Sequence, residues 1–412
     1  MLNAFSVSFL VALIVMCALR LWLGQRQISW VLAHRAVVPA GFADRINLDA
    51  HKKAADYTVA RTRFGRAALL VEVALLLAFT FGGGLQDLHE FWSARVNGLP
   101  YGIALIFSVM LLAAVADLPL AFYHQFVVEA KFGFNRMTIR LFVADLLKQA
   151  ILVVVIGTPA LLAVLWLMEQ MGPLWWVYVW LFWCVFNLLI VFLYPNWIAP
   201  LFNRFVALDD ERLTARVERL LARCGFTSSG LFVMDGSKRS GHGNAYFTGF
   251  GKSKRIVFFD TLLARLQAAE VEAVLAHELG HFKHRHVQKR IALLFATALC
   301  LLAVVAQLID SSWFFSGLGV HAQNAALALI LVSLAGPVFS FLLTPLLRFL
   351  SRRDEFAADR YAAANASASD LIAALVKLYE DNAATLTPDP LHSLFYDSHP
   401  PAALRIARLR QA

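Results

Sequence analysis

Charged residues are scarce in this chain of 412 residues. Asp, Glu, Lys and Arg make up 16 % of it, while apolar residues make up 59 %. Soluble domains are nearer a quarter charged and half apolar, so one ordinary soluble core is excluded. Only four cysteines are present, and no two form a CxxC pair. This excludes a disulfide framework and a cysteine-based zinc knuckle.

The N-terminal apolar run 4–23 lacks the marks of a secretory signal. No basic stretch precedes it, and no small-residue cleavage site follows it. We therefore interpret it as a retained membrane span. Six further runs are long enough to cross about 30 Å of hydrocarbon. The seven predicted spans are 4–23, 67–88, 99–122, 149–171, 174–194, 291–309 and 324–347.

The basic residues follow the loops in an alternating pattern. Eight Lys/Arg lie in 24–66, four in 123–148, fifteen in 195–290 and eight from Arg348 onward, whereas the intervening loops hold only Arg95. Basic loops stay on the cytosolic side of a membrane. The pattern predicts that the N-terminus is outside and the C-terminus inside. It also explains the net charge of +9 without a nucleic-acid partner.

The loop pattern divides the chain into four parts. We predict an N-terminal membrane region of five transmembrane helices with cytosolic loops over 1–205, and a hairpin of helices six and seven over 291–350. Two cytosolic parts, 206–290 and 351–412, are too long and too polar for simple loops. The first contains a short strand 231–234, then two strands around a Gly/Lys/Ser turn within 242–260, and a helix from Gln267. The second of those two strands, 255–259, is β-branched and aromatic. The predicted fold is mainly α, with a small β-sheet.

The helix after Gln267 contains the motif HELGH at 277–281. His277 and His281, four residues apart, lie on one helical face, so both rings can reach one zinc ion. Glu278 can then activate a water molecule as general base. The alternative is an ordinary helix that carries two histidines. The position of the motif within an amphipathic helix favours the metal site.

A catalytic zinc needs a third protein ligand, and Glu355 is the candidate. Spans six and seven form an antiparallel hairpin, so the segments before and after it emerge on the same side. Asp359 follows Glu355 by one turn and can accept a hydrogen bond from a ligand histidine. The alternative for both acids is a solvated face that pairs with Arg352, Arg353 or Arg360.

Taken together, the motifs resemble those of the type I CAAX prenyl endopeptidases, which are integral-membrane gluzincins. The resemblance runs over most of the chain. It rests on FGFNRMT at 132–138, NAYF at 244–247, RIVFFD at 255–260, HELGH with His286, SRRDEFAAD at 351–359, and SHPP at 398–401 with Arg405. It implies a gluzincin-like cytosolic domain with one zinc ion per chain, held by His277, His281 and Glu355, with Glu278 as general base.

The resemblance also suggests residues around the zinc. Asn244, Ala245 and Tyr246 match an edge strand to which a peptide substrate can add as a further strand; a plain structural strand is the alternative. His399 can stabilise the oxyanion of the reaction, or it can cap a helix. Arg405 can receive a C-terminal carboxylate, or it can hold Asp359, which we slightly prefer.

Two histidines after the HELGH motif and one acid within a membrane span have no predicted catalytic role. His284 and His286 do not share the face of the ligand histidines, so we expect surface or supporting roles. Glu72 lies within an apolar span, where acids face a protein interior or a water-filled cavity. We expect it to line an internal chamber; a buried pairing is the alternative.

The sequence therefore predicts a zinc metalloendopeptidase embedded in the bilayer. Its expected substrates are peptides or proteins cleaved near the C-terminus, with or without an attached lipid. The second hypothesis is a general quality-control protease like the stress-induced bacterial zinc proteases. A transporter is disfavoured because no internal repeat is found. The compact loops favour a bacterial inner membrane, with the site on the cytoplasmic side, over the endoplasmic reticulum of a eukaryote.

Overall fold

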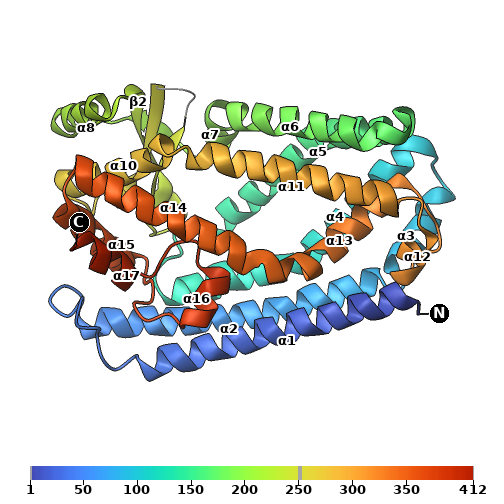
Figure 1. Cartoon of the computed structure of the whole chain (residues 1–412), viewed down its shortest axis with the longest axis horizontal. Helices are drawn as coiled ribbons and strands as arrows, with labels where there is room; N and C mark the ends of the chain where they lie inside the picture. Colours follow the sequence, from blue (N-terminus) through green and yellow to red (C-terminus); the bar gives the residue numbers. More distant parts are fainter. Residues whose placement is uncertain (1, 249–252, 412) are drawn as a thin grey trace.

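A computed structural model describes residues 2–248 and 253–411. Long helices run along the long axis of the molecule (Figure 1). Those of the membrane region are α1 (Ala4–Ala33), α2 (Leu48–Phe79), α3 (Gly84–Ser93), α4 (Gly98–Tyr123), α5 (Ile139–Gln170), α6 (Trp175–Leu193), α11 (His286–Leu308) and α13 (Ala325–Ser340). Helices α1 and α2 pack along one side, and α6 packs against α11 along the other.

Six helices of the described chain are long and apolar enough to span a membrane, and a seventh span forms if α2 and α3 count together. This agrees with the seven predicted spans, except that the second is bent. The axis turns by 49° between α2 and α3. Gly82, Gly83 and Gly84 occupy the bend, and Gly83 has a φ of 80° that other residues rarely adopt.

The last span continues directly into the segment that carries the predicted third ligand. Helix α13, a 3₁₀ turn at Phe341–Leu343 and α14 (Thr344–Asn365) form one run from Ala325 to Asn365. Pro337 and Pro345 flank the turn and interrupt the regular hydrogen bonds there. Glu355 is thus held on a long helix and not on a flexible tail.

A four-stranded sheet lies at one end of the molecule, with strand order β1-β2-β4-β3. The strands are β1 (Phe205–Ala207), β2 (Thr227–Met234), β3 (Ala245–Thr248) and β4 (Ser253–Phe259). β2 and β4 are parallel, and the two outer strands are antiparallel to their neighbours. The expected strands are present; β2 is longer than predicted, and β1 was not predicted. The turn expected between β3 and β4 lies outside the described residues.

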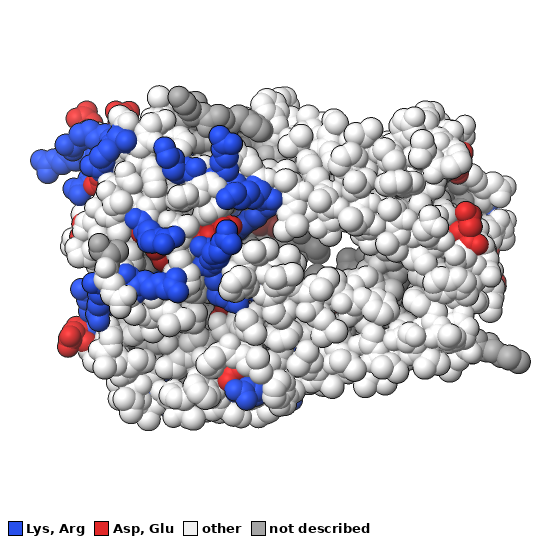
Figure 2. Space-filling model, viewed as in Figure 1, with Lys and Arg blue, Asp and Glu red and all other residues white. Residues whose placement is uncertain are grey.

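Around this sheet pack α8 (Glu211–Cys224), α10 (Ala268–Lys283), α15 (Ala368–Asp381) and α17 (Ala402–Leu409). Apolar side chains dominate their shared core; Leu220, Ile256, Phe258 and Leu279 have no exposed surface. Each such side chain contributes about 1.5–3 kcal/mol through burial. Lys and Arg gather at this end of the molecule (Figure 2), which we call the sheet end. A separate apolar core joins the membrane helices.

Candidate zinc site

Helix α10 presents the HELGH motif from within the core of the sheet end. Glu270 fixes its first turn. This carboxylate accepts a hydrogen bond from the backbone N–H of Gln267 and forms an ion pair with Lys377, both at 2.7 Å. Leu275 and Leu279 bury one face of the helix. His277 and His281 project from another face, as the spacing of four residues predicts.

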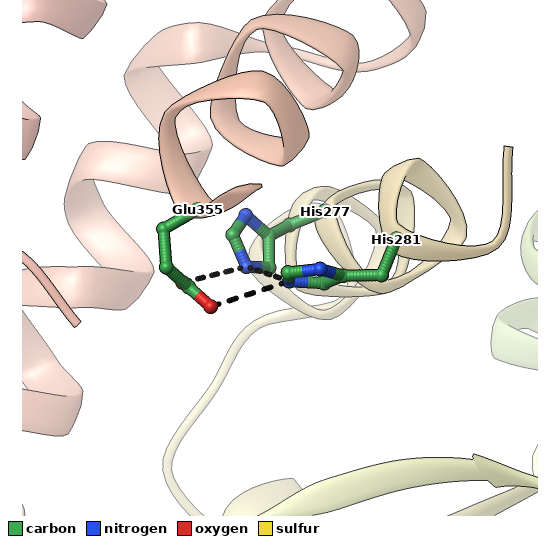
Figure 3. A group of neighbouring side chains, drawn as sticks. All are labelled: His277, His281 and Glu355. Carbon is green, nitrogen blue, oxygen red and sulfur yellow. Dashed lines mark hydrogen bonds and ion pairs between the residues drawn. The ribbon is translucent and has the colours of Figure 1, made fainter. Parts of the chain in front are cut away.

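Glu355 of α14 reaches both histidines (Figure 3). The Nε2 atoms of His277 and His281 are 3.3 Å apart, and each lies 3.4 Å from a carboxylate oxygen of Glu355. Two ligands about 2.05 Å from a tetrahedral zinc are themselves about 3.3 Å apart. The two histidine nitrogens therefore already have the spacing of zinc ligands, and each faces a different oxygen of Glu355 at a similar distance.

An unsatisfied atom supports the same conclusion. Oε2 of Glu355 is buried and has no hydrogen-bond donor among the described residues. The nearest Lys or Arg nitrogen, Nη1 of Arg405, is 3.9 Å from this oxygen, so a closer cation would stabilise the buried carboxylate. Within the described chain, these three residues also form the one group of His, Cys, Asp or Glu whose ligand atoms converge in this way. The donor set thus fits zinc.

Close packing of α10 on α14 makes this geometry possible. A Cβ at Gly280 would lie 2.9 Å from Cα of Ala358 and 3.1 Å from Cβ of Tyr361. Only glycine allows the two helices to approach this closely. Ala358 and Ala362, which have no exposed surface, keep the facing surface of α14 small. The glycine of HELGH therefore sets the distance between the two helices that carry the ligands.

His277 is held from behind by an acid and an arginine. Its Nδ1 lies 2.8 Å from Oδ1 of Asp359. Arg405 of α17 donates two hydrogen bonds to Asp359, at 2.6 and 2.9 Å, and is buried. The geometry favours the structural alternative for Arg405, because its guanidinium is engaged by Asp359. Burial lowers the pKa of Arg405, but Asp359 outweighs this and raises it.

His281 has a supporting partner in His286, one of the two histidines for which the sequence predicted a surface or supporting role. Its Nδ1 lies 3.0 Å from Nδ1 of His286, whose Nε2 lies 3.4 Å from Asp354. His286 is buried at the start of α11, because the chain turns sharply at Arg285 with a φ of 56°. This turn brings a residue from the next helix back onto the motif. His284 is exposed and stacks on His286.

The protonation of the α10 groups depends on their surroundings. Burial, together with the neighbouring His277, lowers the pKa of His281 to about 4, so its ring is neutral and able to bind a metal. Burial also lowers the pKa of His277, but the neighbouring carboxylates of Asp359 and Glu355 outweigh it and raise the value to about 9. Burial raises the pKa of Glu278, which makes its carboxylate a stronger base.

Of the remaining predicted residues, His399 contacts Glu355, and Asn244 shares a cavity with His399. His399 is exposed, and its Nε2 lies 3.4 Å from Glu355. Ala245 and Tyr246 belong to β3, which is an edge strand in the sheet order. Asn244 precedes β3, and its side chain is exposed. His399 and Asn244 both line a cavity of about 1190 Å³ that extends to α1 and α2.

Glu72 does not line this cavity. It pairs with Arg20 at 3.0 Å, and it is Arg20 that lines the cavity. Glu72 therefore forms an ion pair, as the alternative expected, but its side chain is exposed and not buried. The cavity itself was not visible in the sequence, because residues far apart in the chain form its walls.

Comparison with known proteins agrees with this site and extends over the whole chain. A family model of the CAAX prenyl protease N-terminal region, with five membrane helices, matches residues 27–204, and a model of peptidase family M48 matches residues 207–412. A CAAX prenyl protease 1 homolog of Arabidopsis thaliana is 32 % identical over 406 residues, covering 96 % of this chain and 95 % of the relative.

Two yeast proteins are similar in sequence or structure. CAAX prenyl protease 1 of Saccharomyces cerevisiae is 35 % identical over 316 residues, covering 72 % of this chain and 69 % of the relative. The crystal structure of S. mikatae Ste24p superposes with a TM-score of 0.92, at 28 % identity and 99 % coverage of both chains. This chain is thus a multi-pass membrane protein that belongs to the CAAX prenyl protease 1 family of M48 zinc metallopeptidases.

Proposed function

We propose that this protein hydrolyses prenylated proteins near their C-termini, at a zinc site formed by His277, His281 and Glu355. The observation that carries the proposal is the convergence of these three side chains: the two histidine Nε2 atoms are 3.3 Å apart, each is 3.4 Å from one of the two Glu355 oxygens, and the buried Oε2 accepts no hydrogen bond among the described residues. The relatives of similar length are CAAX prenyl proteases by name. Their similarity includes the first five spans and not only the motif.

Zinc bound there would polarise the scissile carbonyl and lower the pKa of a water molecule to about 7. Glu278 accepts the proton from that water and passes it to the leaving amine. His399, which stands at the open side of the site, donates a hydrogen bond to the oxyanion. Asp359 and His286 fix the orientation of the two ligand rings by binding their Nδ1 atoms.

The substrate backbone binds β3 as a further strand. β3 is an edge strand, and exposed Asn244 stands where the strand borders the cavity. Main-chain hydrogen bonds along such an edge bind a peptide with little demand on its side chains. Arg405 has a positioning role, since it holds Asp359 against His277.

The active site faces the cytosol in this proposal. It lies at the sheet end, where the long basic segments gather, and basic segments remain on the cytosolic side. In a bacterium the protein would occupy the inner membrane.

A Glu278→Gln variant tests the mechanism. We expect it to bind one zinc per chain and to lose cleavage of a farnesylated peptide by about 100-fold or more. Glu218→Gln, at an exposed position of α8, is the matched control and retains activity. Full activity of Glu278→Gln would refute the mechanism. Cleavage of a misfolded membrane protein, but not of the farnesylated peptide, would favour the quality-control hypothesis.

A further inference from the structure

The cavity beside the zinc site has one strongly polar wall. Helix α2 contributes residues at helical spacing, all on one face: Thr58, Arg61, Thr62, Gly65, Arg66 and Leu69. Helix α1 adds Arg20 and Gln27 to the same wall. A cavity that held only an apolar chain would not need arginine, threonine and glutamine side chains in its wall, so this wall suits a polar group of a bound ligand.

Arginines are prominent in the cavity wall. Four arginines and two carboxylates, Glu129 and Asp397, line the cavity, and two further acids outside the lining pair with two of the arginines. Glu129 is already engaged, because it accepts a hydrogen bond of 2.6 Å from buried Tyr57 and lies 3.5 Å from His124 and His242. The arginines that remain can attract an anionic ligand.

Two of the four arginines lack an acidic partner. Arg20 pairs with Glu72, and Arg239 with Asp145. Arg66 donates to the neutral amide oxygen of Gln25 at 2.8 Å. Arg61 lies over the ring of Tyr57, 5.4 Å from its centroid. Among residues 2–248 and 253–411, neither Arg61 nor Arg66 forms an ion pair, so both guanidinium groups can still bind an anion.

The direction of β3 indicates which end of a bound substrate would reach Arg61 and Arg66. Where the cavity meets this strand, its wall is formed by Asn244, Gly243 and His242, at the N-terminal end of β3. A peptide that adds antiparallel to β3 sends its C-terminal residues past Asn244 into the cavity. The free carboxylate at the end of the substrate is the anion that arrives there.

We propose that Arg61 and Arg66 form a binding site for the C-terminal α-carboxylate of the substrate. The inference rests on the proposed peptidase function. Arginine binds a carboxylate through two parallel hydrogen bonds, so the site would be specific as well as attractive. It makes the enzyme measure its cleavage position from the end of the chain. Arg405, engaged by Asp359, is not needed for this role.

The test compares two farnesylated peptides that differ only in a free C-terminal acid or an amide. The wild-type protein prefers the acid by about 10- to 100-fold in kcat/KM, mainly through KM. In the Arg61→Gln/Arg66→Gln double variant this ratio falls toward one, and each single variant lowers it in part. Arg63→Gln, an exposed neighbour on α2 that does not line the cavity, keeps the wild-type ratio. Zinc content and the thermal unfolding midpoint establish whether each variant is folded. If the double variant does not fold, the acid-to-amide ratios of the two single variants test the inference.

Equal cleavage of acid and amide by the wild type overturns the inference, as does an unchanged ratio in folded variants. If the two arginines bind a lipid phosphate instead, both peptides are cut equally, and the double variant binds vesicles of phosphatidylglycerol less well. A failure of the proposed function looks different, because the zinc-loaded wild type then cleaves neither peptide.

Discussion

Replacing Gly280 by alanine perturbs the contact that brings the zinc ligands together. The added Cβ would meet Cα of Ala358 at 2.9 Å and its carbonyl oxygen at 3.2 Å. Both are backbone atoms, so no side chain can turn aside to make room. Ordinary contact for a Cβ begins near 3.4 Å, and α14 must therefore retreat from α10 by about 0.5 Å.

This retreat carries Glu355 with it, because Glu355 lies one turn before Ala358 on the same helix. Zinc sites tolerate errors of only about 0.2 Å in ligand distance. We therefore expect Gly280→Ala to weaken zinc affinity by at least about tenfold. The effect on folding is smaller, since overpacking costs roughly 1–3 kcal/mol while alanine favours a helix over glycine by about 1 kcal/mol.

The assay is a zinc competition titration against a chelator in detergent, with thermal unfolding measured in parallel. Gly336→Ala in α13 is the matched control, because a Cβ there meets nothing within 4 Å. The control should bind zinc like the wild type. If Gly280→Ala also binds zinc with wild-type affinity, close approach of α10 and α14 does not set the site geometry, and the reasoning fails.

Three further predictions concern the support of the site. Asp359→Asn removes the negative charge beside Nδ1 of His277 and should lower zinc affinity by about 10- to 100-fold. An unchanged zinc affinity would show that Asp359 does not support the His277 ring. His286→Phe keeps the ring but not the bond to His281, and a measured zinc affinity below that of the exposed control His284→Ala is expected. Removal of zinc by a chelator should abolish cleavage and lower the thermal unfolding midpoint. Zinc at 100 times its Kd adds about 2.7 kcal/mol to the free energy of unfolding. An unfolding midpoint that does not change on chelation would show that zinc makes no contribution to stability.

Local patterns were sufficient to predict the membrane spans and the two histidines of the candidate zinc site. Apolar runs of span length need no partner to be recognised, and histidines at i and i+4 share a face in any α-helix. The exception among the spans was 67–88, where the bend at Gly82–Gly84 became clear only in three dimensions. Strand β1 has only three residues, too few for a periodic pattern.

Prediction of Glu355 needed one long-range argument, the antiparallel hairpin of the last two spans. Its result agrees with the 3.4 Å contacts to both histidines. For Arg405 the sequence supported only a slight preference for Asp359, because the same motif also fits a substrate carboxylate. Two hydrogen bonds to Asp359 in the buried interior favour the second.

The sequence by itself determined how many segments can cross the membrane, which helix carries the metal motif, and which residue types can bind zinc. These properties depend on periodicity, run length and side-chain chemistry, all of which are local. Only the tertiary structure decided how closely α10 and α14 approach at Gly280, that His286 turns back onto His281, and that Arg61 and Arg66 share a cavity with the site. Those relations join residues from different helices, and packing, not pattern, fixes the distances between them.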